Sequence, residues 1–218
     1  MIKVGLTGNR FSGKDTVCKL FEQIGVPVFN ADIVLKFILN YNYEINYKIR
    51  STFGDVFCLK GELLDISKFS EKRKFDDLID IVEYELLNAY ELFNKKHKGK
   101  LYTIFHSSIL MEREWQKVMD YNISVYSSRE ERKLRAKRIS GMAEGVINNM
   151  MCYEMDDIVK NSLSEYIISN YPSAHHIYGD ICEQVNKIDQ AIIDRYLLDE
   201  QTDILSRHYG EDINPELV

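Results

Sequence analysis

The stretch "IKVGLTGNRFSGKDTVCKLFEQIG" (residues 2–25) decides the fold of this chain. It contains a short apolar run, then Gly8, Gly13 and Lys14 in the spacing G-x-x-x-x-G-K, then apolar residues at helical spacing. A strand, a glycine-rich turn and a helix in this order form the context in which that spacing builds a phosphate-binding loop. The alternative is an ordinary strand-to-helix turn. We predict the loop, because the strand and the helix are both present.

The loop divides its work between backbone and side chains. The backbone N–H groups of residues 9–16 are expected to face inward toward a triphosphate, and the helix N-terminus adds partial positive charge. Glycine is needed at two positions because the turn requires conformations that a Cβ obstructs. Lys14 is expected to reach the β and γ phosphates of ATP. The predicted nucleotide-binding residues are Gly8, Asn9, Arg10, Phe11, Ser12, Gly13, Lys14, Asp15 and Thr16.

Position 15 departs from the usual pattern, which has a Ser or Thr hydroxyl there to hold a magnesium ion. This chain has Asp15, and the hydroxyl follows at Thr16. A carboxylate is a hard oxygen ligand that suits Mg²⁺, and its charge is favoured in the first turn of a helix. We therefore predict that Asp15 binds Mg²⁺ directly or through one water, and that Thr16 donates to a phosphate oxygen. The alternative is that Asp15 only caps the helix.

Short apolar runs alternate with long helical stretches along the rest of the chain, which is the pattern of a mostly parallel sheet covered by helices. The predicted class is α/β, with a five-stranded mostly parallel sheet in the P-loop nucleoside triphosphate hydrolase and kinase fold. Between the first two strands, an apolar helical face of Val17, Leu20, Phe21 and Ile24 is stopped by Gly25. The predicted strands are residues 2–7, 26–30, 101–105, 122–126 and 166–170.

We predict one domain over residues 1–218. It carries a helical acceptor-binding insertion at about 33–97, which is much longer than one crossover helix requires, and a helical lid at about 129–163. A further helix is expected at about 180–198.

Composition excludes several classes of function. The 28 basic and 34 acidic residues give a net charge of −6, which argues against a general binder of nucleic acid or anionic membrane. The four cysteines form no C-x-x-C pair, so neither a zinc site nor a disulfide framework is indicated. The apolar run in "MIKVGLTG" is too short for a signal peptide or a membrane span. We expect a cytoplasmic protein with a small-molecule substrate, and its oligomeric state is left open.

The second predicted strand ends in "VPVFNAD", and its carboxyl end lies at the same rim of a parallel sheet as the phosphate loop. Asp32 is therefore a candidate to orient an acceptor hydroxyl and take its proton during phosphoryl transfer. The alternative is that Asp32 only caps the helix that follows.

The segment "SREERKLRAKR" (128–138) places arginines three residues apart on a predicted helix. At that spacing the positions drift slowly around the helix, so several arginines can point at one place. The alternative is a solvated basic face paired with Glu130 and Glu131. The four arginines are Arg129, Arg132, Arg135 and Arg138.

These residues together resemble the dephospho-coenzyme A kinase family. The stretch "VGLTGNRFSGKDTVCKLFEQIGVPVFNAD" (4–32) is similar to the family's opening, in which G-L-T-G, a phosphate loop and a short helix precede G-V-P and a D-A-D triplet. Two later segments, "FGDVFCLKGELLDISKF" (53–69) and "LSEYIISN" (163–170), resemble it more weakly.

The resemblance implies transfer of the γ-phosphoryl group of ATP to the ribose 3′-hydroxyl of dephospho-coenzyme A, with Mg²⁺, in coenzyme A biosynthesis. It implies that residues 8–16 bind ATP and that Asp32, which matches the second Asp of D-A-D, is the base. Arg135 and Arg138 fall in the family's arginine-bearing lid, where an arginine stabilises the charge on the phosphoryl group in transit. The predicted catalytic residues are Lys14, Asp32, Arg135 and Arg138.

Several departures from the family pattern fall on the acceptor side. Asn30 replaces the first acid of D-A-D, and Asp80 and Ile81 stand where the family has His and Pro. In the family's D-V-P-L-L-F-E segment, His106 replaces the acid and Ser108 the proline, while Glu112 is kept.

Because these changes leave the ATP side intact, three functions stay open: a dephospho-coenzyme A kinase, a deoxynucleoside or nucleoside monophosphate kinase, and an ATP-binding protein without transferase activity. His106, at the end of the third strand, either hydrogen-bonds a phosphate or the acceptor, or is a buried and satisfied core histidine.

Overall fold

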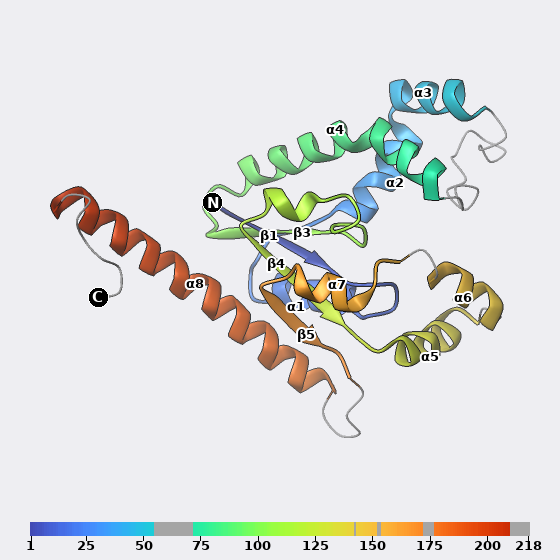
Figure 1. Cartoon of the computed structure of the whole chain (residues 1–218). Coiled ribbons are helices and arrows are strands. Elements are labelled where there is room, and N and C mark those ends of the chain that lie inside the picture. The colour runs from blue at the N-terminus through green and yellow to red at the C-terminus, as the bar shows by residue number, and fades with distance from the viewer. Residues whose placement is uncertain (55–71, 142, 152–153, 172–176, 210–218) are drawn as a thin grey trace. The chain divides into compact units, whose positions relative to one another are not determined.

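The computed structural model of the chain describes residues 1–54, 72–141, 143–151, 154–171 and 177–209 (Figure 1). The chain divides into two compact units, Met1–Pro172 and Ser173–Val218. The second unit contains one long helix, α8 (Ile177–Tyr209), so the predicted helix at 180–198 is confirmed and extends further at both ends. Most of the family-like segment 53–69 lies outside the described residues.

The first unit contains the predicted five-stranded sheet, in the order β2-β3-β1-β4-β5 with every neighbouring pair parallel. Because all strands run the same way, their carboxyl ends meet at one rim, and the phosphate loop follows β1 at that rim. The second strand is shorter than predicted and begins after Pro27, which has no N–H to donate to a neighbouring strand. The strands are β1 (Ile2–Thr7), β2 (Val28–Asn30), β3 (Tyr102–His106), β4 (Tyr121–Tyr126) and β5 (Tyr166–Ser169).

Helix α1 (Lys14–Gln23) connects β1 to β2 and buries Val17, Leu20 and Phe21, as its apolar spacing predicts. Ile24 was assigned to the same face but is 43% exposed, because the helix has ended at Gln23 and Ile24 is its C-cap. Gly25 follows with φ +89°, a left-handed conformation that a side chain resists, and so stops the helix as expected.

The remaining helices of this unit fall in the two stretches for which the sequence predicts an insertion and a lid. The insertion contains α2 (Ala31–Tyr41), α3 (Tyr43–Phe53) and α4 (Lys72–Lys96). The lid contains α5 (Arg129–Ser140), α6 (Glu144–Met151) and α7 (Asp157–Ser162), and a short 3₁₀ helix, η3 (Trp115–Val118), precedes β4. Within the described residues, no helix is both long enough and apolar enough to cross a membrane.

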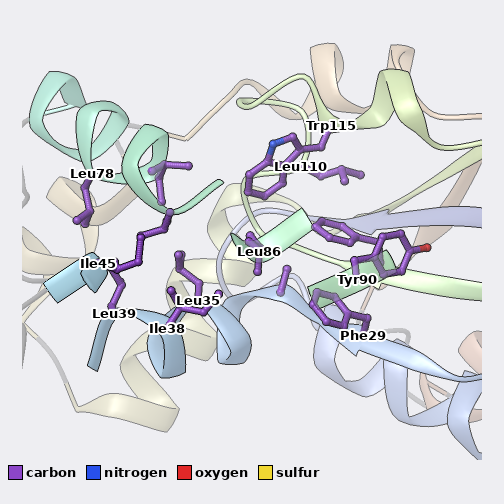
Figure 2. Packing of buried hydrophobic residues seen from close by; sticks show 14 of the residues in the cluster. Phe29, Leu35, Ile38, Leu39, Ile45, Leu78, Leu86, Tyr90, Leu110 and Trp115 are labelled. Carbon is purple, nitrogen blue, oxygen red and sulfur yellow. The ribbon is translucent and has the colours of Figure 1, made fainter. Parts of the chain in front are cut away.

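The helices of the insertion share one apolar core with the edge of the sheet (Figure 2). Helices α2, α3 and α4 pack on one another in pairs, and Phe29 of β2 stacks on Phe105 of β3 with ring centroids 5.6 Å apart. Tyr90 of α4 meets the Phe105 ring edge-on at 4.9 Å. This packing fixes the start of α2, and therefore Asp32, against the end of β3. Figure 2 labels Phe29, Leu35, Ile38, Leu39, Ile45, Leu78, Leu86, Tyr90, Leu110 and Trp115 of this core.

Candidate functional site

Both glycines of the phosphate loop are required by the geometry around them. Gly13 has φ +96°, and a Cβ at this position would lie 2.2 Å from Nδ2 of Asn170. A Cβ at Gly8 would lie 2.6 Å from the backbone oxygen of Val125. The loop also holds Phe11 at φ 63°, a conformation that costs a non-glycine residue free energy. A strained loop of this kind persists only where its surroundings hold it, which is typical of a ligand-binding turn.

The sequence predicts that the backbone N–H groups of residues 9–16 all face a ligand. In the structure, some of them instead donate to groups of the protein. Arg10 N–H donates to Oε1 of Glu154 (2.9 Å), and Ser12 and Thr16 N–H donate to carbonyls inside the loop, at 3.1 Å and 3.0 Å. Within the described ranges, the N–H groups of residues 9–16 with no hydrogen-bond acceptor are those of Asn9, Phe11, Gly13, Lys14 and Asp15. The anion-facing nest is therefore smaller than predicted and is centred on the helix N-terminus.

Lys14 is only 8% exposed, and its ammonium has no hydrogen bond or ion pair to any residue that the structure describes. The side chain thus brings a positive charge to the loop that no acid of the described chain pairs with, so the position favours an anionic ligand. Buried hydroxyls at the same rim are also without partners: Oγ1 of Thr7 at the end of β1, Oγ of Ser12 in the loop, and Oγ of Ser127 after β4. Most buried polar groups in folded chains have a hydrogen-bond partner, so these three hydroxyls are available to a ligand or a water.

Asp15 does not cap α1. The N-cap is Gly13, and no side chain caps the helix by a hydrogen bond. The Asp15 carboxylate is 75% exposed, and its Oδ1 lies 3.7 Å from Nε2 of His106. Asp15 thus presents a hard oxygen donor to solvent beside the nest, as a ligand to Mg²⁺ must. In the described part of the chain, no three His, Cys, Asp or Glu side chains gather closely enough to hold a metal. Phosphate and water would therefore have to complete the coordination of an ion at Asp15.

His106 is buried but not satisfied, so the interpretation as an ordinary core histidine is wrong. The side chain is 1% exposed, and neither ring nitrogen has a hydrogen-bond partner among the described residues. Burial lowers the pKa of His106; Asp32 and Asp15 act in the opposite direction, and Lys14 adds to the lowering. The imidazole is therefore neutral at pH 7, with one lone pair and one N–H to offer.

This lowered pKa predicts a pH dependence of stability for the ligand-free protein. In the folded chain the pKa of His106 lies below its ordinary value of 6.5, so the unfolded chain binds more protons between the two values. The stability that His106 contributes is present above pH 6.5 and is lost as pH falls through the folded pKa. Urea denaturation between about pH 7.5 and about pH 5.5 should show a slope steeper than that of His106→Gln by up to about 1.4 kcal/mol per pH unit.

The control for this measurement is His97→Gln, since His97 lies at the end of α4 and its ring nitrogen already pairs with the Phe93 carbonyl. This variant should follow the wild-type curve. If the His106→Gln and wild-type curves run parallel, the predicted pKa shift does not exist.

Asp32 also does not cap its helix, because Oδ1 of Asn30 accepts the Ile33 N–H and caps α2. Asparagine and aspartate are equally good N-caps, so the change from the family's first acid preserves the start of the helix. The Asp32 carboxylate instead accepts the Ser108 N–H at 3.2 Å and the Ser107 hydroxyl at 3.4 Å, just beyond the end of β3. It lies at the rim where the phosphate loop begins.

The arginines of α5 divide into two pairs. Arg129 and Arg138 are exposed, whereas Arg132 and Arg135 both reach the phosphate loop, as the three-residue spacing predicts. Arg135 donates to the carbonyls of Phe11 (3.2 Å) and Ser12 (3.0 Å). It thereby holds the strained part of the loop from outside.

Arg132 is 3% exposed and forms the centre of a buried ion-pair network. Its guanidinium donates to Oε2 of Glu154 (2.6 Å) and Oδ2 of Asp157 (2.9 Å). Asp157 also accepts from the Asn9 side chain at 2.8 Å, and Glu154 accepts the Arg10 N–H. The network joins the lid to the first half of the loop.

Sequence reasoning missed several residues of the site, among them Lys160, Asn170, Glu154 and Asp157. Lys160 of α7, 1% exposed, donates to Oε1 of Glu112 and to the Ser108 carbonyl, each at 3.0 Å, and burial lowers its pKa while Glu112 raises it. Asn170 donates to the Ser12 carbonyl at 2.7 Å. Asn170 follows the last strand and could have been found from the rule that ligands lie at the carboxyl ends of parallel strands. No local pattern connects Lys160 or Glu154 to the loop.

Asp80, which stands where the family pattern has His, is paired in the structure. Asp80 of α4 forms an ion pair with Arg113, which also lies 3.4 Å from a carboxylate oxygen of Glu83. The acid thus ties α4 to the segment that precedes η3, and the next residue, Ile81, packs against the core of the insertion.

Comparison with known proteins gives a consistent result. A family model described as dephospho-CoA kinase matches residues 2–175. A dephospho-CoA kinase of Clostridium perfringens is 31% identical over 186 residues, which cover 78% of this chain and 89% of the relative. One of Aquifex aeolicus is 28% identical over 193 residues, covering 86% and 96%.

Solved structures agree on the fold. The protein TT1252 from Thermus thermophilus superposes with a TM-score of 0.74 at 22% identity, covering 87% of this chain and 96% of that one. A dephospho-CoA kinase from Campylobacter jejuni gives 0.59 at 19% identity, with the same coverage. A shikimate kinase from Acinetobacter baumannii gives 0.51 at 18% identity, covering 89% and 94%. At these identities the structures show the P-loop kinase fold and nothing finer.

Proposed function

This chain belongs to the dephospho-CoA kinase family and is a phosphotransferase, and we propose that it transfers the γ-phosphoryl group of ATP to the ribose 3′-hydroxyl of dephospho-CoA. The observation that carries the proposal is the ammonium of Lys14, which has no partner in the described structure and lies beside N–H groups that are also unpaired. Such an arrangement is favourable only with a polyanion bound.

The loop binds the polyphosphate of ATP. The N–H groups of Gly13, Lys14 and Asp15 donate to phosphate oxygens, and Lys14 adds a full positive charge at the β and γ phosphates. Thr16 is exposed in the first turn of α1, so its hydroxyl is available to donate to the same group. These contacts hold the phosphoryl group in place before transfer, which is most of what a kinase must do.

Asp15 fits the requirement for a Mg²⁺ ligand, directly or through one water. A divalent cation, when bound, neutralises charge on the phosphates and favours the attack of the acceptor. Asp15 offers its carboxylate from the first turn of α1, at the position where the phosphate oxygens gather.

Asp32 orients the acceptor hydroxyl and takes its proton. Its carboxylate is held by the Ser108 N–H and the Ser107 hydroxyl, so it keeps one direction at the rim of the sheet. Fixed orientation of the base contributes to catalysis because the hydroxyl must approach the phosphorus in line.

The lid helix α5 supplies the arginines. Arg135 donates to loop carbonyls and so supports the loop, and the proposed role of Arg138, exposed one turn further on, is to reach the phosphoryl group in transit when the lid closes. An arginine at that position would stabilise the developing charge while the closed lid excludes water.

The assignment of Asp32 makes a specific prediction. Asp32→Asn should lower kcat by about 10²–10⁴-fold, because the base is lost, while the affinity for ATP stays within about threefold. Steady-state kinetics together with calorimetric titration of ADP separate the two effects. Asp77→Asn, which changes an exposed carboxylate on α4, is the matched control and should be unchanged. Equal losses of ATP affinity and kcat would contradict the role as base.

The acceptor is tested by incubating the protein with Mg-ATP and a panel of dephospho-CoA, deoxynucleoside monophosphates and nucleoside monophosphates, and measuring ADP. Turnover with dephospho-CoA alone supports the proposal. Turnover with a monophosphate alone assigns the chain to that class of kinase. ATP binding without turnover on any acceptor would mean that the acceptor-side changes have removed transferase activity.

A further inference from the structure

Asp15 and His106 form a pair of donors that the phosphate-loop pattern does not contain. Asp15 stands in α1 where the pattern has a hydroxyl, and His106 ends β3, where β3 lies between β2 and β1. Their nearest atoms, Oδ1 and Nε2, are 3.7 Å apart. The carboxylate faces solvent, whereas the imidazole behind it is 1% exposed.

The separation of the two atoms is too long for a direct hydrogen bond. A ring N–H donating to Oδ1 would bring the atoms within about 3.2 Å. The two ring nitrogens of His106 have no other hydrogen-bond partner among the described residues. Leaving such groups unpaired costs about 1–3 kcal/mol, so the buried imidazole is placed for a ligand that the pair shares.

The same separation is within reach of two donors to one cation. Ligand atoms that each lie about 2.0–2.1 Å from an ion can be at most about 4.2 Å apart. Around an octahedral ion, neighbouring ligand atoms at that bond length lie about 2.9 Å apart. The observed 3.7 Å is longer than this, so a rotation of the exposed Asp15 side chain, without a change of backbone, would be needed to bring both donors onto one ion. The charges acting on His106 come from Asp32, Lys14 and Asp15, which sum to one negative charge, and a cation at this place is electrostatically favoured.

We propose that Asp15 and His106 together ligate the divalent cation that accompanies the nucleotide, and that the imidazole nitrogen makes this site prefer Mn²⁺ over Mg²⁺. The inference rests on the proposed function, since the phosphates of the nucleotide must complete the coordination. Mg²⁺ favours oxygen ligands almost without exception, whereas first-row transition metals accept imidazole nitrogen readily. His106, which stands where the family pattern has an acid, is the residue that gives the site this preference.

The test reads the metal's ligands directly, without turnover. Protein labelled with ¹⁵N at histidine is mixed with Mn²⁺ and ADP, and pulsed electron paramagnetic resonance measures coupling of the bound Mn²⁺ to ¹⁵N. We expect the coupling in the wild type and in His97→Gln, where a remote histidine is changed, and its loss in His106→Gln. The ratio of Mn²⁺ to Mg²⁺ affinity in the presence of ADP should fall by about tenfold or more in His106→Gln.

A second variant covers the case in which His106→Gln fails to fold. His106→Asp replaces the nitrogen donor with oxygen, so it should lose the ¹⁵N coupling and bind Mg²⁺ at least as well as the wild type. Bound Mn²⁺ without ¹⁵N coupling in the wild type, coupling that survives both substitutions, or no Mn²⁺ bound at all would each overturn the inference. Kinase turnover with Mg-ATP in any of these cases would leave the proposed function standing. Coupling to ¹⁵N without turnover on dephospho-CoA would support the metal site and contradict the proposed function.

Discussion

Lys14→Met should lower kcat/KM by roughly 10²–10³-fold, a loss of about 3–4 kcal/mol of transition-state stabilisation, without destabilising the fold. The physical reason is that the ammonium has no partner in the described structure and therefore contributes nothing to the folded chain by itself. Because no hydrogen bond or ion pair is lost with the ammonium, the melting temperature should stay close to that of the wild type. Coupled measurement of ADP release and thermal unfolding in the absence of nucleotide give the two quantities.

Lys19→Met is the matched control, because Lys19 lies on the same helix and is exposed. It should change neither activity nor stability beyond about 0.5 kcal/mol. A Lys14→Met variant that unfolds at a markedly lower temperature would show that Lys14 is a structural residue, and retention of activity within about tenfold would remove it from catalysis.

Arg132→Met is expected to have the largest effect on stability. The substitution leaves two carboxylates, Glu154 and Asp157, without the guanidinium that lies 2.6 Å and 2.9 Å from them. Removing one partner from a buried ion-pair network costs about 3–5 kcal/mol, which for a chain of this size lowers the melting temperature by roughly 10 °C. Thermal and urea denaturation measure the loss.

The same substitution should also weaken nucleotide binding, since Asp157 holds the side chain of Asn9 and Glu154 holds the Arg10 N–H. Arg129→Met, an exposed change on the same helix, should stay within about 0.5 kcal/mol of the wild type. If Arg132→Met is as stable as Arg129→Met, the network does not stabilise the chain.

The sequence predicted secondary structure correctly where the residues of one short segment are enough to determine it. The apolar spacing of Val17, Leu20 and Phe21 is enough to form one face of α1, because any sheet beside it will bury that face. The glycine spacing of the loop was equally informative, since the structure requires glycine at both positions: Gly13 has φ +96°, and a Cβ at Gly8 would lie 2.6 Å from the Val125 carbonyl oxygen.

The boundaries were less well predicted for physical reasons. Ile24 has the right spacing for the apolar face, but the helix ends one residue earlier and the side chain meets solvent. Asn30 and Asp32 are both residue types that cap helices well. Only the direction of the backbone after β2 decides that Asn30 caps α2, so that the Asp32 carboxylate can accept the Ser108 N–H at the rim of the sheet.

The sequence by itself therefore determined the α/β class, the phosphate loop and the family of this kinase, because each depends on residues close together in the chain. The tertiary structure alone decided that Arg132 is buried among acids, that Lys160 lies on Glu112, and that His106 faces Asp15. Those contacts arise when parallel strands place their carboxyl ends side by side. The residues that meet there are far apart in the chain, and no local sequence pattern predicts that they come into contact.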